Sequence, residues 1–436
     1  MVLGLSMSGM YIDFALFARL LMFAQKNVVF VGAPGVGKTR LAIDAAFGVV
    51  QRPVVVTGKE DMTFGDLVAR YVVEEGRPRI VLGELSKAVV SSWIGVDSGF
   101  GPTHIVFDEI NRCNTDTLLG EVFTALDIEH RMTVPVIRGN AFAYIRRLAE
   151  DTAQGELESQ FSSLCDLLGV DNVRVSLKRI IEGVRQKRLD GIPLPYSFRI
   201  IATMNVLDRA QLYRLGYAFQ RRFGFIYVLP PTDDYRPVFE HGEIRDDVSQ
   251  SPVYKVLSDP NSFVVKQAAR ELIIDRVSPD LASLTDGDYP TLVKIVDSVE
   301  EASKIYSQAS QQFDGVSRLT AFLYKAANSL GVELGISILV DIAKLYIVAT
   351  VLGADKGLGL EKIADLVATA FILPQLSAAL PRIRAEAILF GESSHGLRRL
   401  RDALSVLEKV FGPSSMTVRM VGGLSVELPS ISVQSG

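Results

Sequence analysis

A glycine-rich loop near the amino end of the sequence places the strongest constraint on how this chain can fold. Within the stretch "VFVGAPGVGKTR", residues Gly32–Thr39 fit the pattern G-x-x-x-x-G-K-[S/T]. The apolar run Val28–Val31 precedes the loop, and an amphipathic helix is expected from about Thr39 to Val49. A buried strand, a loop of exposed backbone and a helix in this order predict a parallel α/β sheet that holds a polyphosphate.

Each residue type in the loop has a separate physical role. Glycines let successive backbone N–H groups point inward at phosphate oxygens, and the positive end of the following helix faces the same anion. Lys38 can reach the β and γ phosphates, and the hydroxyl of Thr39 is a ligand for Mg²⁺. The expected nucleotide-binding residues are Gly32, Ala33, Pro34, Gly35, Val36, Gly37, Lys38, Thr39 and Arg40.

A second segment, "HIVFDEINRCN", places two acids directly after an apolar run. Ile105–Phe107 is predicted to be a buried parallel strand that ends at Asp108 and Glu109. Alone, an Asp-Glu pair at this position would be interpreted as a helix cap. After a phosphate-binding loop, Asp108 is expected to hold Mg²⁺ together with Thr39, and Glu109 to polarise the attacking water.

A third apolar strand, Arg199–Thr203, is followed by the polar residue Asn205. Because the carboxyl ends of parallel strands share one edge of a sheet, we expect Asn205 to lie near Lys38 and the two acids. Further on, Arg221 and Arg222 stand at the expected end of a helix. They either suit the negative end of the helix dipole or reach the γ-phosphate of a neighbouring subunit as an arginine finger.

Three motifs together resemble those of AAA+ ATPases, in the branch that contains MoxR, the dynein-related ATPases and the McrB GTPase. They are "GAPGVGKT", "FDEINR" at 107–112 and "ATMNVLDR…AFQRRF" at 202–223. The resemblance implies an α/β P-loop NTPase fold, in which a parallel sheet with helical layers is followed by an all-α lid. It also implies Walker A residues Gly32–Thr39, Walker B residues Asp108 and Glu109, sensor-1 residue Asn205, NxxDR residues Asp208 and Arg209, and a trans-acting arginine at Arg221 or Arg222.

The chain is expected to divide into a nucleotide-binding domain at 1–230, a helical lid at 231–412 and a tail at 413–436. Within the first domain we predict an amphipathic helix at 1–26 that covers the sheet edge, and a β-hairpin around Glu74–Pro78. Lid helices are predicted at about 253–275, 289–311, 316–330, 335–353, 360–381 and 395–411. The tail alternates around Gly422–Gly423 and is interpreted as a β-hairpin or a flexible end.

The nucleotide-binding domain also carries a helical insert at about 141–190. The arms of a pre-sensor-1 hairpin, "RMTVPVIRG" and "IPLPYSFRI", are expected to flank it. Its first half is acidic and its second half is basic, including Arg185, Lys187 and Arg188. The favoured interpretation is two helices that pair their opposite charges; the alternative is a projecting arm that grips a partner or a nucleic-acid backbone.

Composition excludes several classes of protein. The 436 residues include only two cysteines, Cys113 and Cys165, and four scattered histidines, so neither a disulfide framework nor a metal cluster is expected. The net charge of -4 predicts no general attraction to nucleic acid, which would bind only through a partner or the basic insert. Charges interrupt every apolar window, so no membrane span is predicted, and a cytoplasmic location is expected.

The favoured function is a ring-forming ATPase, a hexamer by resemblance, that hydrolyses ATP-Mg at subunit interfaces to remodel a protein client or drive a partner enzyme. One alternative is a McrB-like GTPase that works with a McrC-like nuclease, suggested by the NxxD spacing at 205–208. Another is a nucleotide-dependent scaffold with little hydrolysis. A von Willebrand A-type partner would instead indicate maturation of the MoxR type.

Overall fold

The computed structural model describes residues 9–46, 52–74, 76–150, 154–205, 216–230, 235–244, 246–277, 296–376, 380–390 and 393–426. A five-stranded sheet in the order β2-β5-β8-β1-β9 forms its centre, and all paired neighbours run parallel. The strands are β1 (Asn27–Gly32), β2 (Val54–Thr57), β5 (Ile105–Asp108), β8 (Ile200–Asn205) and β9 (Phe223–Tyr227).

The strands are apolar on both faces because helices cover the sheet on both sides. Along β1, Val28 and Phe30 belong to one hydrophobic core, whereas Val29 and Val31 belong to a second core on the other face. The helices of the two layers are α1 (Gly9–Phe23) and α2 (Lys38–Ala46) on the first face, and α3 (Phe64–Val68), α4 (Glu84–Asp97) and α5 (Thr115–Leu126) on the second.

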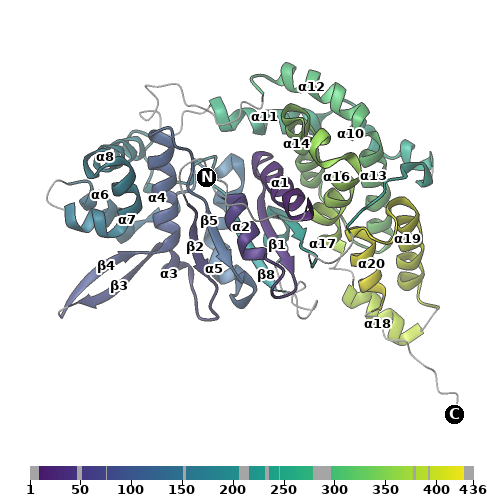
Figure 1. Ribbon diagram of the computed structural model, residues 1–436, viewed down its shortest axis with the longest axis horizontal. Coiled ribbons are helices and arrows are strands. Elements are labelled where there is room, and N and C mark those ends of the chain that lie inside the picture. The colour runs from purple at the N-terminus through teal and green to yellow at the C-terminus, as the bar shows by residue number, and fades with distance from the viewer. Residues whose placement is uncertain are drawn as a thin grey trace, which may run out of the picture.

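Helix α1 differs from the predicted amphipathic helix. Phe14, Phe17 and Leu21 are fully buried, and even Asp13 is 8% exposed. The helix packs against α2, β1 and the edge strand β9 on one side, and against lid helices on the other (Figure 1). The helix therefore covers the sheet edge as predicted, but its exposed side includes the apolar Ile12 and Phe23, and lid helices contact another side.

The first domain carries two additions beside α4 (Figure 1). The predicted hairpin is confirmed: β3 (Ala69–Glu74) pairs antiparallel with β4 (Arg77–Leu82). The insert contains α6 (Gly139–Leu148), α7 (Gln154–Leu168) and α8 (Val170–Gln186), between the short paired strands β6 (Ile137–Arg138) and β7 (Gly191–Ile192). Within α8, Arg174 pairs with Asp171 one turn earlier, and Arg179 joins the helix to Asp97 at the end of α4.

The region after β9 is helical. Its described helices are α10 (Pro252–Ser258), α11 (Phe263–Val277), α12 (Val299–Gln312), α13 (Asp314–Ser329), α14 (Ile336–Leu352), α15 (Ala354–Leu358), α16 (Leu360–Val367), the π-helix η7 (Ala368–Ile372), α17 (Leu373–Leu376), α18 (Leu380–Phe390), α19 (His395–Phe411) and α20 (Met416–Val426). The helix predicted at 253–275 is divided between α10 and α11, because the chain turns at Asp259–Ser262. Short 3-10 helices occur at Ile110–Arg112, Ile128–His130, His241–Glu243 and Asp246–Gln250.

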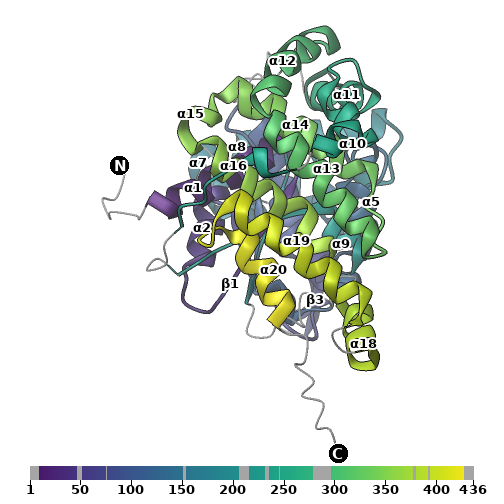
Figure 2. The ribbon, with the colours of Figure 1, turned by 90° about the vertical axis from the view of Figure 1, so that its right-hand side faces the viewer.

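The predicted hairpin in the tail is wrong where the tail is described. Residues 416–426 form α20, which lies beside α19 on the outer side of the lid (Figure 2). The buried carboxylate of Asp365 accepts the backbone N–H groups of Met416 and Thr417 at 2.8 Å each, and this satisfies the first turn of the helix. Buried Val418 and Val421 then pack into the lid core, so tertiary contacts select the helix.

Membrane-spanning helices, metal-ligand clusters and disulfides were not expected from the sequence. In the described part of the chain, no helix is long and apolar enough to cross a membrane. No group of three or more His, Cys, Asp or Glu residues in it could hold a metal ion. Cys113 and Cys165 are buried free thiols.

Candidate nucleotide-binding site

The strand register brings the predicted site residues to one edge of the sheet. Gly32 pairs with Asn205, so the glycine-rich loop begins beside the last residue of β8. On the other side of β8, Phe107 pairs with Ala202, and Asp108 follows directly. The loop, the two acids and Asn205 therefore meet at the carboxyl ends of three adjacent strands.

The loop between β1 and α2 depends on glycine at two positions. Gly35 and Gly37 have φ values of +80° and +86°, in the left-handed region that disfavours other residues. A Cβ atom on Gly37 would also lie 2.6 Å from the hydroxyl of Tyr11, which α1 places against the loop. Tyr11 is not among the predicted site residues, because nothing in its local sequence pattern shows that α1 crosses this loop.

Lys38 is buried at the start of α2, where its Nζ donates to the carbonyl of Ala33 at 2.7 Å. Burial lowers the pKa of Lys38, while the nearby carboxylates of Asp108 and Glu109 raise it. The side chain of Lys38 thus folds back over the loop to a carbonyl 5 residues earlier in the chain. The carboxylates of Asp108 and Glu109 are close enough to influence its pKa. A phosphate chain in the loop would give this cation its natural partner.

Thr39 and Asp108 are in direct contact. The hydroxyl of Thr39 donates to Oδ1 of Asp108 at 2.6 Å, and Thr203 donates to the same oxygen at 2.7 Å. Mg²⁺ prefers oxygen ligands, and it usually takes one or two from the protein and the rest from phosphates and water. This donor set fits Mg²⁺ bound with a nucleotide, and Thr39 and Asp108 are the residues that would hold it.

Glu109 has a fixed side chain and an unusual backbone. Its φ of +55° is left-handed, which costs about 1–2 kcal/mol for a residue with a Cβ. Its N–H donates to the hydroxyl of Thr203 at 2.9 Å. One carboxylate oxygen accepts the side-chain amide of Asn205 at 2.5 Å, and the other pairs with Arg112 at 2.6 Å. These contacts aim the carboxylate along the sheet edge.

Thr203 is a site residue that the motifs did not single out. It bridges Asp108 and the backbone of Glu109, and its side chain is 1% exposed. Thr203 and Asn205 lie two residues apart on β8 and therefore point to the same face. The sequence did contain a signal for Thr203: it is a hydroxyl residue in an otherwise apolar strand, and it lies on the same face of the strand as Asn205.

Three further residues were predicted to bind the nucleotide: Arg40, Asp208 and Arg209. The guanidinium of Arg40 lies 3.7 Å from Asp44 on the exposed side of α2. Asp208 and Arg209 lie outside the described residues.

Arg221 and Arg222 lie at the opposite edge of the sheet. They end α9 (Tyr217–Arg222), immediately before β9, whose first residue, Phe223, pairs with Asn27 at the start of β1. The six residues of β1 separate that position from the loop by about 20 Å. The two arginines are therefore remote from the loop of their own chain.

The two arginines are held differently. Arg222 donates to Asp127 at 2.6 Å and lies over the ring of Phe123, 5.4 Å from its centroid, and its side chain is 14% exposed. The side chain of Arg221 is 46% exposed and reaches Asp127 only at 3.9 Å. Arg222 is anchored, whereas Arg221 has freedom to meet a group outside its own chain.

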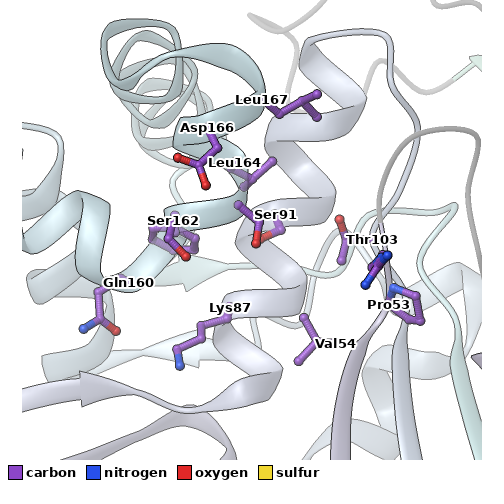
Figure 3. Close-up of a pocket in the computed structure, with 13 residues that line it drawn as sticks. Pro53, Val54, Lys87, Ser91, Thr103, Gln160, Ser162, Leu164, Asp166 and Leu167 are labelled. Carbon is purple, nitrogen blue, oxygen red and sulfur yellow. The ribbon is translucent and has the colours of Figure 1, made fainter.

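A pocket of about 680 Å³ lies between α4, α7 and the edge strand β2 (Figure 3). Lys87 and Ser91 of α4, Gln160 and Leu164 of α7, and Val54 of β2 are among its lining residues. None of its lining residues belongs to the glycine-rich loop or to the acidic strand end. This pocket is separate from the candidate nucleotide site.

Comparison with known proteins agrees with the fold. Residues 27–223 match the family model of the AAA domain (dynein-related subfamily). The parallel sheet and the helical region after it confirm the predicted P-loop AAA+ sheet with a helical lid. The match supports an AAA-type ATPase domain with nucleotide-binding activity in general.

One solved structure similar to the chain is a proposed ATPase from Cytophaga hutchinsonii ATCC 33406. The two sequences are 14% identical, and the alignment covers 96% of this chain and 84% of that chain with a TM-score of 0.26. At these values the likeness says nothing about function. No curated protein matches this sequence.

Proposed function

We propose that this chain is a ring-forming AAA+ ATPase that binds and hydrolyses ATP-Mg at subunit interfaces, to remodel a protein client or drive a partner enzyme. One observation carries the proposal. The phosphate-binding loop, the two acids and Asn205 share one edge of the sheet, whereas the exposed Arg221 lies at the opposite edge. A chain divided in this way has a complete catalytic centre only when a neighbour supplies the arginine.

In this mechanism the residues of the loop bind the triphosphate and those of β5 and β8 act on water. Lys38 and the loop N–H groups hold the phosphates, and Mg²⁺ when bound would neutralise part of their charge. Glu109, oriented by Asn205, accepts a proton from the attacking water. Arg221 of the neighbouring subunit stabilises charge on the transferred phosphoryl group.

We favour ATP over GTP because of how Asn205 is used. In the GTPase alternative, Asn205 would begin an NxxD element that reads the base. Its side chain instead donates to the carboxylate of Glu109 at 2.5 Å, and its backbone N–H donates to Asn111 at 3.3 Å. These contacts suit a residue that senses the γ-phosphate region.

Replacing Glu109 by Gln tests the proposal. Nucleotide binding should persist, because the loop and Lys38 are unchanged, while ATP turnover should fall roughly 10²- to 10⁴-fold. Glu84→Gln is the matched control, since Glu84 pairs with Lys87 on α4 and lies outside the site. Measuring nucleotide affinity and turnover with both ATP and GTP gives the readout. Undiminished hydrolysis in the Glu109 variant would exclude it as the base, and turnover with GTP alone would favour the GTPase alternative.

A further inference from the structure

Three consecutive residues between α1 and β1 connect the first domain with the lid. Gln25, Lys26 and Asn27, here termed the 25–27 junction, are 6%, 8% and 2% exposed. Gln25 has a left-handed φ of +67°, and its side-chain amide donates to the backbone carbonyl of Glu271 in α11 at 2.7 Å. Contacts with the lid thus hold the junction in a conformation that a non-glycine residue rarely adopts.

The same junction caps the helix that carries the arginines. The Nζ of Lys26 donates to the carbonyl of Arg221 at 2.7 Å, and the side-chain amide of Asn27 donates to the carbonyl of Arg222 at 3.3 Å. Carbonyls at a helix end lack partners within the helix and carry partial negative charge, so a buried cation there is favourable. Since α9 has only 6 residues, these two contacts fix its last turn.

Lys26 also contacts the lid. Its ammonium group pairs with Asp341 of α14 and lies 5.8 Å from the ring centroid of Phe371 in η7. Asp341 also pairs with Lys344 at 3.1 Å, and Lys344 pairs with Glu271 at 2.9 Å. A buried chain of alternating charges therefore runs from the end of α9 through α14 to α11.

The charges of this chain hold one another in place. Burial alone would raise the pKa of Asp341, but Lys26 and Lys344 together bring it below its usual value. Burial lowers the pKa of Lys26, and Asp341 opposes this effect. Both lysines face the same carboxylate, so loss of either one leaves Asp341 with a partner.

We infer that Lys26 is a positioning residue for Arg221, and that it fixes the arginine relative to the lid. The inference rests on the proposed role of Arg221 in a neighbour's active site. The charge chain joins α11 and α14 to the last turn of α9, so a movement of these lid helices would pass through Asp341 and Lys26 to the arginine offered to the next subunit. Lys26 would then link the position of the lid in one subunit to the chemistry of the adjacent site.

The variant Lys26→Met tests this role. It removes the donor to the Arg221 carbonyl but keeps the length of the side chain, and Asp341 retains Lys344. We expect turnover to fall roughly 10- to 100-fold, as for a catalytic group displaced by about 1 Å, with nucleotide affinity unchanged. Lys362→Met is the matched control, since it breaks the 2.6 Å pair of Lys362 with Asp13, between α16 and α1, without touching α9.

Mixed assemblies separate positioning of a trans-acting arginine from a structural role. Lys26→Met subunits keep an intact Glu109, whereas Glu109→Gln subunits keep an intact Arg221. Mixing the two variants should give more activity than the sum of the two alone, because each Glu109→Gln subunit can place its Arg221 at the competent site of a neighbouring Lys26→Met subunit. An Arg221→Ala and Glu109→Gln mixture should show the same gain, and it reports on the proposed function itself.

The outcomes are distinguishable. Wild-type turnover in folded Lys26→Met, or no gain on mixing while the Arg221→Ala mixture gains, would overturn the role of Lys26. If neither mixture gains, the proposed trans arginine fails and the inference falls with it. Should Lys26→Met not fold, the neutral pair Lys26→Met/Asp341→Asn replaces it, with the same expected loss and gain.

Discussion

The two edges of the central sheet differ in the groups that they gather. The edge at the carboxyl ends of the strands, here called the carboxyl edge, combines Asp108 and Glu109 with the buried Lys38. The edge at the amino ends, here called the amino edge, gathers buried cations that each make one hydrogen bond to a helix end: Arg131 to the last carbonyl of α5, Arg199 to the last turn of α1, and Lys26 to the last turn of α9. Arg131 and Arg199 also donate to backbone carbonyls between residues 195 and 198, in the loop before β8. These three residues are no more than 8% exposed.

Helix direction explains this difference. In an α/β sheet the helices run antiparallel to the strands, so helix amino ends lie at the carboxyl edge and helix carboxyl ends at the amino edge. The partial charges of the helix ends then favour anions at the first edge and cations at the second. The carboxyl edge is suited to bind a triphosphate. The amino edge is suited to hold positive charges, and the exposed Arg221 lies there.

The largest expected effect tests whether the amino edge contributes to catalysis at all. Arg221→Ala should lower turnover roughly 10³-fold, because the transferred phosphoryl group loses a stabilising charge. Nucleotide affinity and the melting temperature should change little, since this side chain is half exposed and only weakly paired. Steady-state turnover and nucleotide titration measure the two quantities. A loss of affinity equal to the loss of turnover would contradict a role confined to the transition state.

The second prediction concerns the carboxyl edge alone. Lys38→Met keeps the volume of the buried side chain but removes its charge, and nucleotide affinity should fall about 10- to 100-fold. Lys59→Met is the control, because Lys59 is exposed in the loop that follows β2 at the same edge. Titration with a fluorescent nucleotide compares the variants. Equal affinities for the Lys38 and Lys59 variants would show that the loop does not use its lysine.

The third prediction uses the excess of cations at the amino edge. Burial, followed by the charges of Arg199 and Arg131, lowers the pKa of His104 from 6.5 to about 3. Between these pH values the unfolded chain binds a proton that the folded protein does not, so stability falls as the pH drops. The free energy of unfolding should decrease by about 2 kcal/mol from pH 7 to pH 5 through this residue.

His104→Asn should remove that part of the pH dependence. The amide oxygen of Asn can still accept the N–H of Arg199, which His104 accepts through Nδ1 at 3.2 Å. Urea unfolding at pH 5 and pH 7 measures the slope, with the exposed His130→Asn as the control. An unchanged slope in His104→Asn would mean that burial and the nearby cations do not lower the pKa of this histidine.

The two edges also differ in how far the sequence could predict them. The carboxyl edge follows from local patterns, because Asp108 and Asn205 each end an apolar strand, and Lys38 ends the glycine-rich loop that follows a third strand. Tyr11 could not be found in this way, since it reaches Gly37 only through the packing of α1. At the amino edge, the contact of Lys26 with Asp341 spans 315 residues, and no local pattern reports such a pairing.

The errors in the fold have the same origin. The sequence pattern of α20 allows both strand and helix, and the carboxylate of Asp365, 51 residues away, supplies the cap that selects the helix. The sequence of α1 likewise did not show that lid helices would contact one of its sides. Local periodicity predicted the sheet and most lid helices, whereas long-range packing decided what each surface meets.

The smallest expected effect separates the two adjacent arginines. Arg222→Ala removes the ion pair with Asp127 and the contact with the ring of Phe123, so the free energy of unfolding should fall by about 1–2 kcal/mol. Turnover per folded subunit should stay close to that of the wild type, because this guanidinium is already committed within its own chain. Arg222→Lys should recover part of the stability, since an ammonium can pair with Asp127 but cannot stack as a planar group. If instead Arg222→Ala abolished turnover and Arg221→Ala did not, the arginine presented to the neighbour would be the anchored one, and Asp127 would have to release it during the cycle.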